Sequence, residues 1–380
     1  MSTSPLIFHS RPRAEADWTC PRSRYYAYDY QGGIQKDNLT IDLFIGTTIH
    51  DGIAAIGTQW KDSGSANIDK IAETSGDVVF TTLSEYLAED PGGELFSREQ
   101  SALVNGLLRV FYKNMWPNLI SQYPTIIAIE QEMLYKHHGN MVFMCKPDLV
   151  LESPEGELVY CEWKSSSSKK EEWINQWNTS IQVHATMKAI EETLKKPVLG
   201  TIVQGLYKGY YSYGKFSSPI AYGYYYQKAA NPPFTKGSVM YSSEYKAGYK
   251  RTPVWEMEGG MKTWVERMSQ ETTSEQLPQT PLIFPRWDLS DAFFRQRTTR
   301  ESNILNTTHF DGSDLSVEEL DTLYPQSFKA CSPGYGHKCN FYTICHGGPA
   351  ILEDPLSNGY ILKNHEHEAP YHELAKELGL

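Results

Sequence analysis

The sequence lacks an excess of positive charge, long hydrophobic runs and a dense set of cysteines. A formal net charge of -11 over 380 residues argues against general adhesion to nucleic acid, so any such contact must come from local basic patches. No apolar stretch approaches the length of a membrane span, and the first residues lack the apolar core of a signal peptide. We therefore expect a cytoplasmic protein with no membrane partner. Six cysteines in so long a chain favour core thiols or metal ligands over a disulfide framework.

The composition provides enough apolar material for a large core. With 40% hydrophobic and 21% charged residues, the chain can form one elaborated domain or two. Period-two and helical patterns predict an α/β fold with the order strand, strand, strand, helix, strand. The main predicted elements are helices at 42–59, 97–116 and 170–195, and strands at 126–135, within 141–170 and at 198–206.

The stretch from Met141 to Lys170 has the clearest chemical pattern. Two apolar runs flank the turn-forming residues Ser153 to Gly156, which predicts two strands joined by a tight turn. Side chains alternate along a strand, so Glu162 and Lys164 share one face of the second strand. If the two strands pair, Asp148 lies beside Glu162, and two carboxylates crowd next to an ammonium group.

Two carboxylates and a lysine at one place suit metal-assisted hydrolysis of phosphodiesters. Oxygen ligands such as Asp148 and Glu162 hold Mg2+ or Mn2+, which polarises a phosphate and lowers the pKa of a bound water. Lys164 would stabilise the negative charge that builds up in the transition state. The alternative is a solvated hairpin edge with ordinary charges, which so short a pattern does not exclude.

A helical histidine is a further candidate ligand. The predicted helix at 42–59 has an apolar stripe of isoleucines, and His50 lies within it, four residues after Gly46. A histidine beside such a stripe is usually structural, yet a neutral imidazole is also a good ligand for a divalent ion.

These residues carry a resemblance to a known family. The Pro-Asp pair that ends at Asp148, followed by Glu162-x-Lys164, resembles the motif of the PD-(D/E)XK nuclease superfamily. The Gly-x-x-x-His that ends at His50 resembles the first motif of its RecB-like branch. The resemblance implies an α/β fold with a restriction-endonuclease-like core, in which helices flank a mixed central sheet, and with helical and β insertions. It also implies that His50 joins Asp148 and Glu162 at the metal, and that Asp148, Glu162 and Lys164 are catalytic.

Two further positions fit the RecB-like pattern. The predicted strand at 126–135 carries Glu130 and Glu132, and Glu130 fits the acidic position of the family better. The helix after the hairpin carries Gln182 where the branch has Gln-x-x-x-Tyr, so the resemblance implies that Gln182 is a catalytic residue near the active site. The chain has Thr186 where the branch has the tyrosine.

Cysteines gather near the C-terminal end. Three of them fall within fifteen residues that include proline and glycine, namely Cys331, Cys339 and Cys345. A metal site needs a fourth ligand, and His337 or His346 would complete a zinc site. Cys145 and Cys161 lie in predicted strands and are better explained as core residues.

The AddB-type and CRISPR-associated spacer-acquisition nucleases suggest a different fourth ligand. In these families a lone cysteine before a Pro-Arg-aromatic run, as at Cys20, joins three C-terminal cysteines in an iron-sulfur cluster, and a 4Fe-4S cluster would clip the chain ends together. Their last two cysteines are spaced like Cys339 and Cys345, whereas Cys331 and Cys339 are separated by seven residues where the family usually has two.

Three segments are candidates for DNA contact. Ser165 to Ser168 fit a phosphate-binding loop at a helix start or, equally, a flexible turn. The tyrosine-rich segment at 206–227 is typical of base-stacking channels, but a pair of strands explains it more simply. A basic cluster follows further along the chain, at Arg295, Arg297 and Arg300.

Six features of these families occur here in the expected order, namely Cys20, Gly-x-x-x-His, Pro-Asp, Glu-x-Lys, Gln182 and the three C-terminal cysteines. The resemblance therefore implies a metal-dependent DNA nuclease, with exonuclease action on single-stranded or frayed ends. The alternatives are an endonuclease of the same superfamily, a non-catalytic iron-sulfur or zinc DNA-binding protein on the same fold, and a structural zinc protein of unrelated fold. We predict one nuclease domain at 1–349, with insertions at about 60–95 and 231–300, and a tail at 350–380. The sequence does not indicate a particular helicase or recombination partner.

Overall fold

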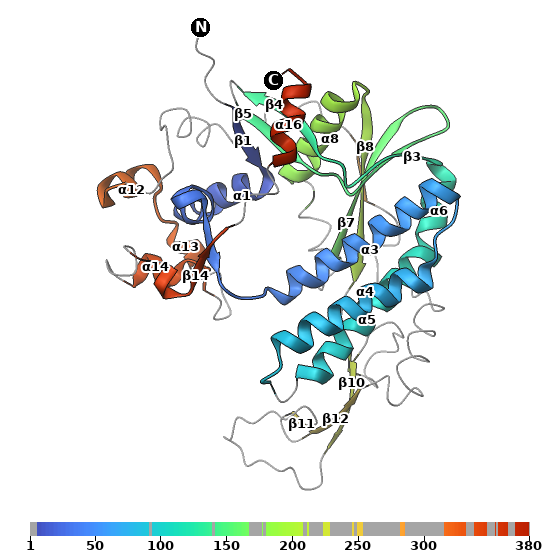
Figure 1. Ribbon diagram of the computed structural model, residues 1–380, viewed down its shortest axis with the longest axis horizontal. Coiled ribbons are helices and arrows are strands. Elements are labelled where there is room, and N and C mark those ends of the chain that lie inside the picture. Colours follow the sequence, from blue (N-terminus) through green and yellow to red (C-terminus); the bar gives the residue numbers. More distant parts are fainter. Residues whose placement is uncertain are drawn as a thin grey trace.

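The computed structural model describes most of the central α/β core and segments near both ends of the chain (Figure 1). The described residues are 6–90, 93–138, 141–166, 177, 180–207, 211–212, 223–228, 245–246, 249–253, 282–285, 315–331, 338–347, 354, 356–363 and 369–379.

A five-stranded mixed sheet forms the centre, in the order β13-β8-β7-β6-β3. Its strands are β3 (Thr125–Ile129), β6 (Leu149–Glu152), β7 (Leu158–Ser166), β8 (Val198–Tyr207) and β13 (Leu282–Pro285). β7 and β8 run parallel, and the other neighbours run antiparallel. The α/β fold with a mixed sheet flanked by helices is therefore confirmed.

One face of this sheet is covered by helices α3 (Ile41–Ser63), α4 (Ile68–Tyr86), α5 (Gly93–Asn114) and α6 (Trp116–Gln122). The isoleucine stripe of α3 is buried against apolar side chains of the sheet, among them Leu151, Val159 and Trp163. A Cβ at Gly52 would lie 2.6 Å from Leu108 Cδ1, so this glycine lets α3 approach α5 closely. The expected helix start at Ser97 is wrong: α5 begins at Gly93, and the Ser97 hydroxyl donates to the Gly93 carbonyl at 2.7 Å.

The other face is covered by α8 (Ile181–Leu194). Its residues Val183, Met187 and Ile190 share a buried cluster with Tyr160 of β7 and Val203 of β8. The predicted start of this helix at 170 falls on residues outside the described part, and the described helix begins at Ile181.

A second, three-stranded sheet in the order β1-β5-β4 adjoins α8. Its strands are β1 (Ile7–Ser10), β4 (Met133–His138) and β5 (Met141–Cys145), and helix α1 (Arg11–Thr19) follows β1. The single strand predicted over 126–135 is wrong, because β3 ends at Ile129 and β4 begins at Met133 in a different sheet. Between them, Glu130 has a positive φ of 44°, which ends the extended conformation.

Segments from both ends of the chain form a small unit of their own, which we call the clip unit (residues 20–36, 315–331, 338–347 and 356–362). It contains α2 (Pro21–Arg24), η1 (Tyr25–Asp29), η2 (Tyr30–Gly32), β2 (Ile34–Lys36), α12 (Val317–Leu323), α13 (Phe328–Cys331), α14 (Tyr342–His346), η4 (Leu356–Asn358) and β14 (Tyr360–Leu362). β14 pairs antiparallel with β2, and Tyr26, Tyr324 and Phe341 lie in its buried core.

The segment expected to form a C-terminal tail contains ordered structure. Besides β14, it holds α16 (Ala369–Glu377), where Tyr371 and Ala375 are buried against Phe8 of β1 and Leu134 of β4. Figure 1 shows this helix beside the small sheet.

A four-stranded sheet in the order β11-β12-β10-β9 lies in the region predicted as an insertion. Its strands are β9 (Tyr211–Ser212), β10 (Gly223–Lys228), β11 (Tyr245–Lys246) and β12 (Tyr249–Pro253). The cluster Arg295, Arg297 and Arg300, as well as His337, lies outside the described residues.

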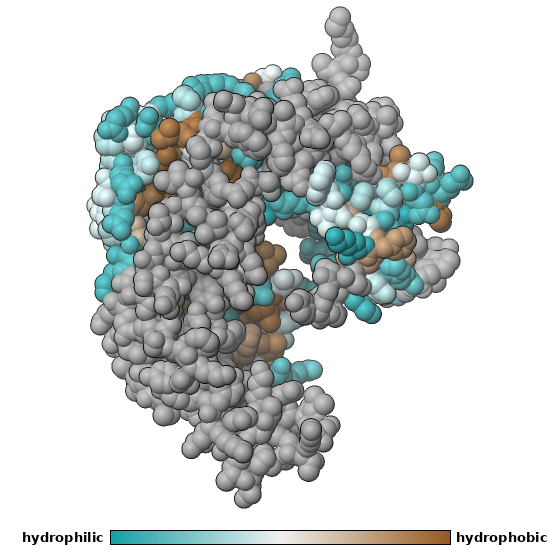
Figure 2. All heavy atoms as spheres, turned by 180° about the vertical axis from the view of Figure 1, so that it is seen from behind, coloured by the Kyte–Doolittle hydropathy of each residue, from teal (hydrophilic) through white to brown (hydrophobic). Residues whose placement is uncertain are grey.

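In the view of Figure 2, hydrophilic residues cover much of the described surface. None of the described helices combines the length and apolar character that crossing a bilayer would demand.

Candidate active site

Asp148 lies directly before β6, on the connection from β5. Asp148 is 7% exposed, and its Oδ2 accepts a hydrogen bond of 2.6 Å from the backbone N–H of Trp163. Because Trp163 follows Glu162 in β7, this bond holds Asp148 next to the strand that carries Glu162 and Lys164. The structure thus brings the Pro-Asp pair next to the Glu-x-Lys motif.

His50 reaches the same place from helix α3. Its Nδ1 lies 3.1 Å from Asp148 Oδ1, and its side chain is 22% exposed. Burial lowers the pKa of His50, but the hydrogen bond and the negative charge of Asp148 outweigh burial, so the pKa is raised overall.

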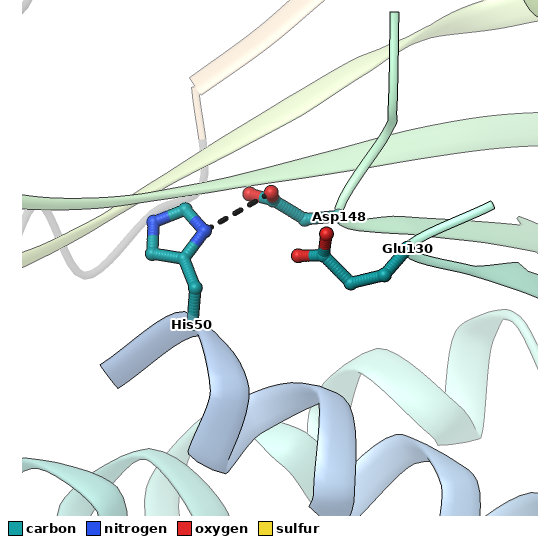
Figure 3. A group of neighbouring side chains, drawn as sticks. All are labelled: His50, Glu130 and Asp148. Carbon is teal, nitrogen blue, oxygen red and sulfur yellow. Dashed lines mark hydrogen bonds and ion pairs between the residues drawn. The ribbon is translucent and has the colours of Figure 1, made fainter. Parts of the chain in front are cut away.

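Glu130 lies at the break between β3 and β4. Its backbone N–H donates to the carbonyl oxygen of Asp148 at 3.2 Å, which fixes Glu130 beside that residue. Burial, followed by the charge of Asp148, raises the pKa of the Glu130 carboxyl, while an ion pair with Lys146 at 3.2 Å opposes the shift. Figure 3 shows the side chains of Glu130 and His50 pointing toward Asp148.

The ligand atoms of His50, Glu130 and Asp148 all lie within 4.8 Å of one another. No other group of three His, Cys, Asp or Glu residues in the described part of the chain is as close. Two carboxylate oxygens and one imidazole nitrogen suit a hard divalent cation such as Mg2+ or Mn2+. The side chains of His50 and Glu130 are 22% and 26% exposed, which leaves solvent access on one side. These residues therefore fit a divalent metal.

Glu162 lies next to this group in a hydrogen-bonded network of its own. It is 1% exposed, and its Oε2 accepts a hydrogen bond from the Tyr160 hydroxyl at 2.8 Å. Its Oε1 accepts hydrogen bonds from the Lys164 ammonium and from the Gln182 amide. Burial and then the charge of Asp148 raise the pKa of Glu162, and the hydrogen-bond donors oppose this rise.

The structure therefore places all five predicted residues of the carboxylate site in one neighbourhood. They form two contacting sets, one around Asp148 with His50 and one around Glu162 with Lys164 and Gln182. The two sets also interact electrostatically, because the charge of Lys164 lowers the pKa of His50 and the charge of Glu162 raises it.

Tyr160 is not among the predicted site residues, although period-two alternation puts it on the same face as Glu162 and Lys164. The family pattern favours Glu130 over Glu132, and the structure places Glu130 beside Asp148, although the sequence predicts one continuous strand for both glutamates. Strand β3 ends at Ile129, so the two glutamates do not share one strand, and only Glu130 lies beside Asp148. Where the family resemblance expects a tyrosine, the chain has buried Thr186, and the phenol at the site comes from Tyr160.

We expect Tyr160→Phe to lower activity by roughly 10-fold, within the range typical of groups that orient a metal ligand. Without the hydroxyl, Glu162 Oε2 loses its donor and the carboxylate is held less firmly. The measurement is the Mg2+ or Mn2+ concentration that gives half-maximal cleavage, which should rise in this variant. Tyr371→Phe, which removes a buried hydroxyl in α16, is the control. Equal metal dependence in both variants would contradict a positioning role for Tyr160.

The four cysteines predicted as cluster ligands lie in or next to the clip unit. Cys20 separates α1 from α2, and its sulfur accepts a hydrogen bond from the backbone N–H of Ser327 at 3.4 Å. The N–H of Cys339 donates to the carbonyl of Cys331 at 3.0 Å. Burial raises the pKa of Cys345 to about 12, with smaller increases from the other three thiols.

All six cysteines are free of disulfides. Cys161 is buried in the main core, as expected, and Cys145 packs beside the second buried cluster. No three cysteine sulfurs in the described residues lie within 4.8 Å of one another, the spacing found for the carboxylate site.

Comparison with known proteins agrees with this geometry. Residues 12–279 match the model of the PD-(D/E)XK nuclease superfamily. No curated protein matches the chain. The match covers more than half of the chain and includes His50, Asp148, Glu162 and Lys164. The protein is therefore a member of the PD-(D/E)XK nuclease superfamily.

Proposed function

We propose that this protein is a metal-dependent deoxyribonuclease that acts as an exonuclease on single-stranded or frayed DNA ends. The observation that carries the proposal is the convergence of His50, Glu130 and Asp148 beside the Glu162–Lys164 pair. These residues come from helix α3, the break between β3 and β4, the connection before β6 and strand β7, and their carboxylates would repel one another without a cation. Members of this superfamily are metal-dependent nucleases, which agrees with that chemistry.

Mg2+ or Mn2+ held by His50, Asp148 and Glu162, with Glu130 as a further oxygen ligand, would polarise the scissile phosphate and make water a stronger nucleophile. In this proposal Lys164 lies against Glu162 and directs its charge at the oxygen atoms that become negative. Gln182 donates to Glu162 and limits the orientation of its carboxylate.

The experiment that tests the activity compares linear single-stranded, linear double-stranded and circular DNA, each with Mg2+, with Mn2+ and with EDTA. The proposal predicts metal-dependent release of mononucleotides or short fragments from linear single strands and from frayed ends. Cleavage of circular DNA would replace the exonuclease assignment with an endonuclease. DNA binding without cleavage under all metals would favour the non-catalytic alternative.

We further propose that Cys20, Cys331, Cys339 and Cys345 bind a 4Fe-4S cluster. The support is their order in the chain and their common place in the clip unit, where the other three cysteines raise the pKa of Cys345. In a cluster each thiolate binds a different iron, so the sulfurs need not lie as close as ligands of a single ion. Zinc with His346 or His337 in place of one cysteine is the alternative.

We expect anaerobically purified protein to be brown and to contain iron and acid-labile sulfide. Cys20→Ser should lose most of both, whereas Cys145→Ala, which alters a thiol outside the clip unit, should retain them. The measurement is the iron, sulfide and zinc content per chain. A colourless protein with one zinc ion and no sulfide would overturn the cluster assignment in favour of zinc.

We also propose a single nuclease domain over residues 1–349, closed by the iron-sulfur cluster that joins its N- and C-terminal segments, with insertions at about 60–95 and 231–300. The proposed location is the cytoplasm.

A further inference from the structure

Two cations from opposite ends of the chain share one aromatic ring. The Arg13 guanidinium carbon lies 5.2 Å from the centroid of the Tyr28 ring, and Lys363 Nζ lies 4.1 Å from it. Arg13 belongs to α1, Tyr28 to η1, and Lys363 follows β14 directly. Three distant segments thus converge on one spot.

The position of Lys363 is fixed by the backbone. Its N–H donates to the Gly33 carbonyl at 2.9 Å, which continues the pairing of β14 with β2. Its side chain is half-buried, and no carboxylate of the described residues forms an ion pair with it. Burial, followed by the charge of Arg13, lowers the pKa of Lys363 to about 8. Arg13 also donates to the Phe8 carbonyl at 2.6 Å. The ring partly offsets the positive charge of Lys363, and a bound anion would offset it further.

The cluster is connected to the element that carries Gln182 through a helix–helix contact. Helix α1, which carries Arg13, contacts α8, the helix that carries Gln182. Figure 1 shows α1 between the small sheet and the clip unit. With a net charge of -11, the protein needs such local cation clusters to hold a polyanion.

We propose that Lys363, together with Arg13 on the Tyr28 ring, binds a backbone phosphate of the DNA strand. This inference rests on the proposed nuclease function and assigns a substrate contact outside the carboxylate site. A phosphate contact gives no base specificity, so it would hold any sequence equally.

The test measures the affinity of the full chain for a labelled single-stranded oligonucleotide in EDTA over a range of salt concentrations. Each neutralised phosphate contributes about 0.7 to the slope of log affinity against log salt for single strands. Lys363→Met should lower the slope by about this amount and weaken binding at low salt. Lys363→Arg should keep the wild-type slope. Lys376→Met, an exposed lysine of α16, is the matched control and should leave the slope unchanged.

Thermal melting of each variant separates a lost contact from a lost fold. Equal slopes for wild type and a folded Lys363→Met would overturn the phosphate site alone, and so would a lowered slope in a folded Lys363→Arg. A wild-type chain that neither binds nor cleaves DNA would instead contradict the proposed function. The two failures are therefore distinguishable.

Discussion

Asp148→Asn should lower cleavage by roughly 10³-fold or more, because it removes a negative charge shared by His50 and the proposed metal. The asparagine side chain has nearly the same shape, and its carbonyl oxygen can still accept the Trp163 N–H. The fold should therefore survive, with a change in the free energy of unfolding of about 1 kcal/mol. The measurements are single-turnover cleavage with saturating Mn2+ and a thermal melt.

Asp148→Ala should be equally inactive but less stable. It leaves the buried Trp163 N–H without an acceptor, a cost of about 1–3 kcal/mol. Asp69→Asn, a carboxylate on α4 that is 72% exposed, is the control and should behave as wild type. If Asp148→Asn cleaved DNA at more than about a tenth of the wild-type rate, an effect of under 1.4 kcal/mol, Asp148 would not lie at the reaction centre.

Lys164→Met should lower cleavage by about 10²- to 10³-fold. Methionine keeps about the same side-chain length and removes the charge, so the variant loses electrostatic stabilisation of the transition state. We expect kcat and kcat/KM to fall together, while DNA affinity in EDTA stays unchanged. The side chain of Lys164 is 25% exposed and pairs with buried Glu162, so removal of the ammonium should also raise the pKa of Glu162 and lower the melting temperature.

Lys188→Met in α8 is a suitable comparison, because this lysine also pairs with a glutamate and is 17% exposed. It should retain activity. A Lys164→Met variant that lost DNA affinity in the same proportion as its cleavage rate would identify Lys164 as a binding residue instead.

Much of the carboxylate site could be predicted because its residues follow local periodicity. Alternation in β7 places Glu162 and Lys164 on one face, and the turn at Ser153 to Gly156 fixes which strands pair. The isoleucine spacing in α3 likewise predicts its buried face.

The break in the strand at Glu130 could not be predicted, because it depends on a non-local contact. Nothing in Ala128-Ile129-Glu130-Gln131 resembles a turn, yet the chain leaves the central sheet there and enters another. The positive φ of Glu130 is maintained by its N–H bond to the Asp148 carbonyl, a contact that exists only after β6 is in place. Tertiary structure overrides strand propensity at this residue.

The start of α5 could not be predicted either, because a local sequence signal is overridden by packing. Ser97 and Gln100 have the spacing of a capping box, but the helix extends one turn further back to Gly93. Both residues are buried in the finished helix, so packing against neighbouring helices, rather than the cap, decides where α5 begins.

The clip unit has a consequence for how the protein is made. Arg22 donates to the carbonyl of Tyr324 at 2.8 Å, and this bond joins residues that are 302 positions apart. A ribosome that synthesises the chain from its N-terminus exposes Tyr25 and Tyr26 long before their partners Tyr324 and Phe341 exist. The unit can close only after translation has passed residue 362. A truncated chain would keep the carboxylate residues but leave these tyrosines uncovered, a surface that chaperones and proteases recognise.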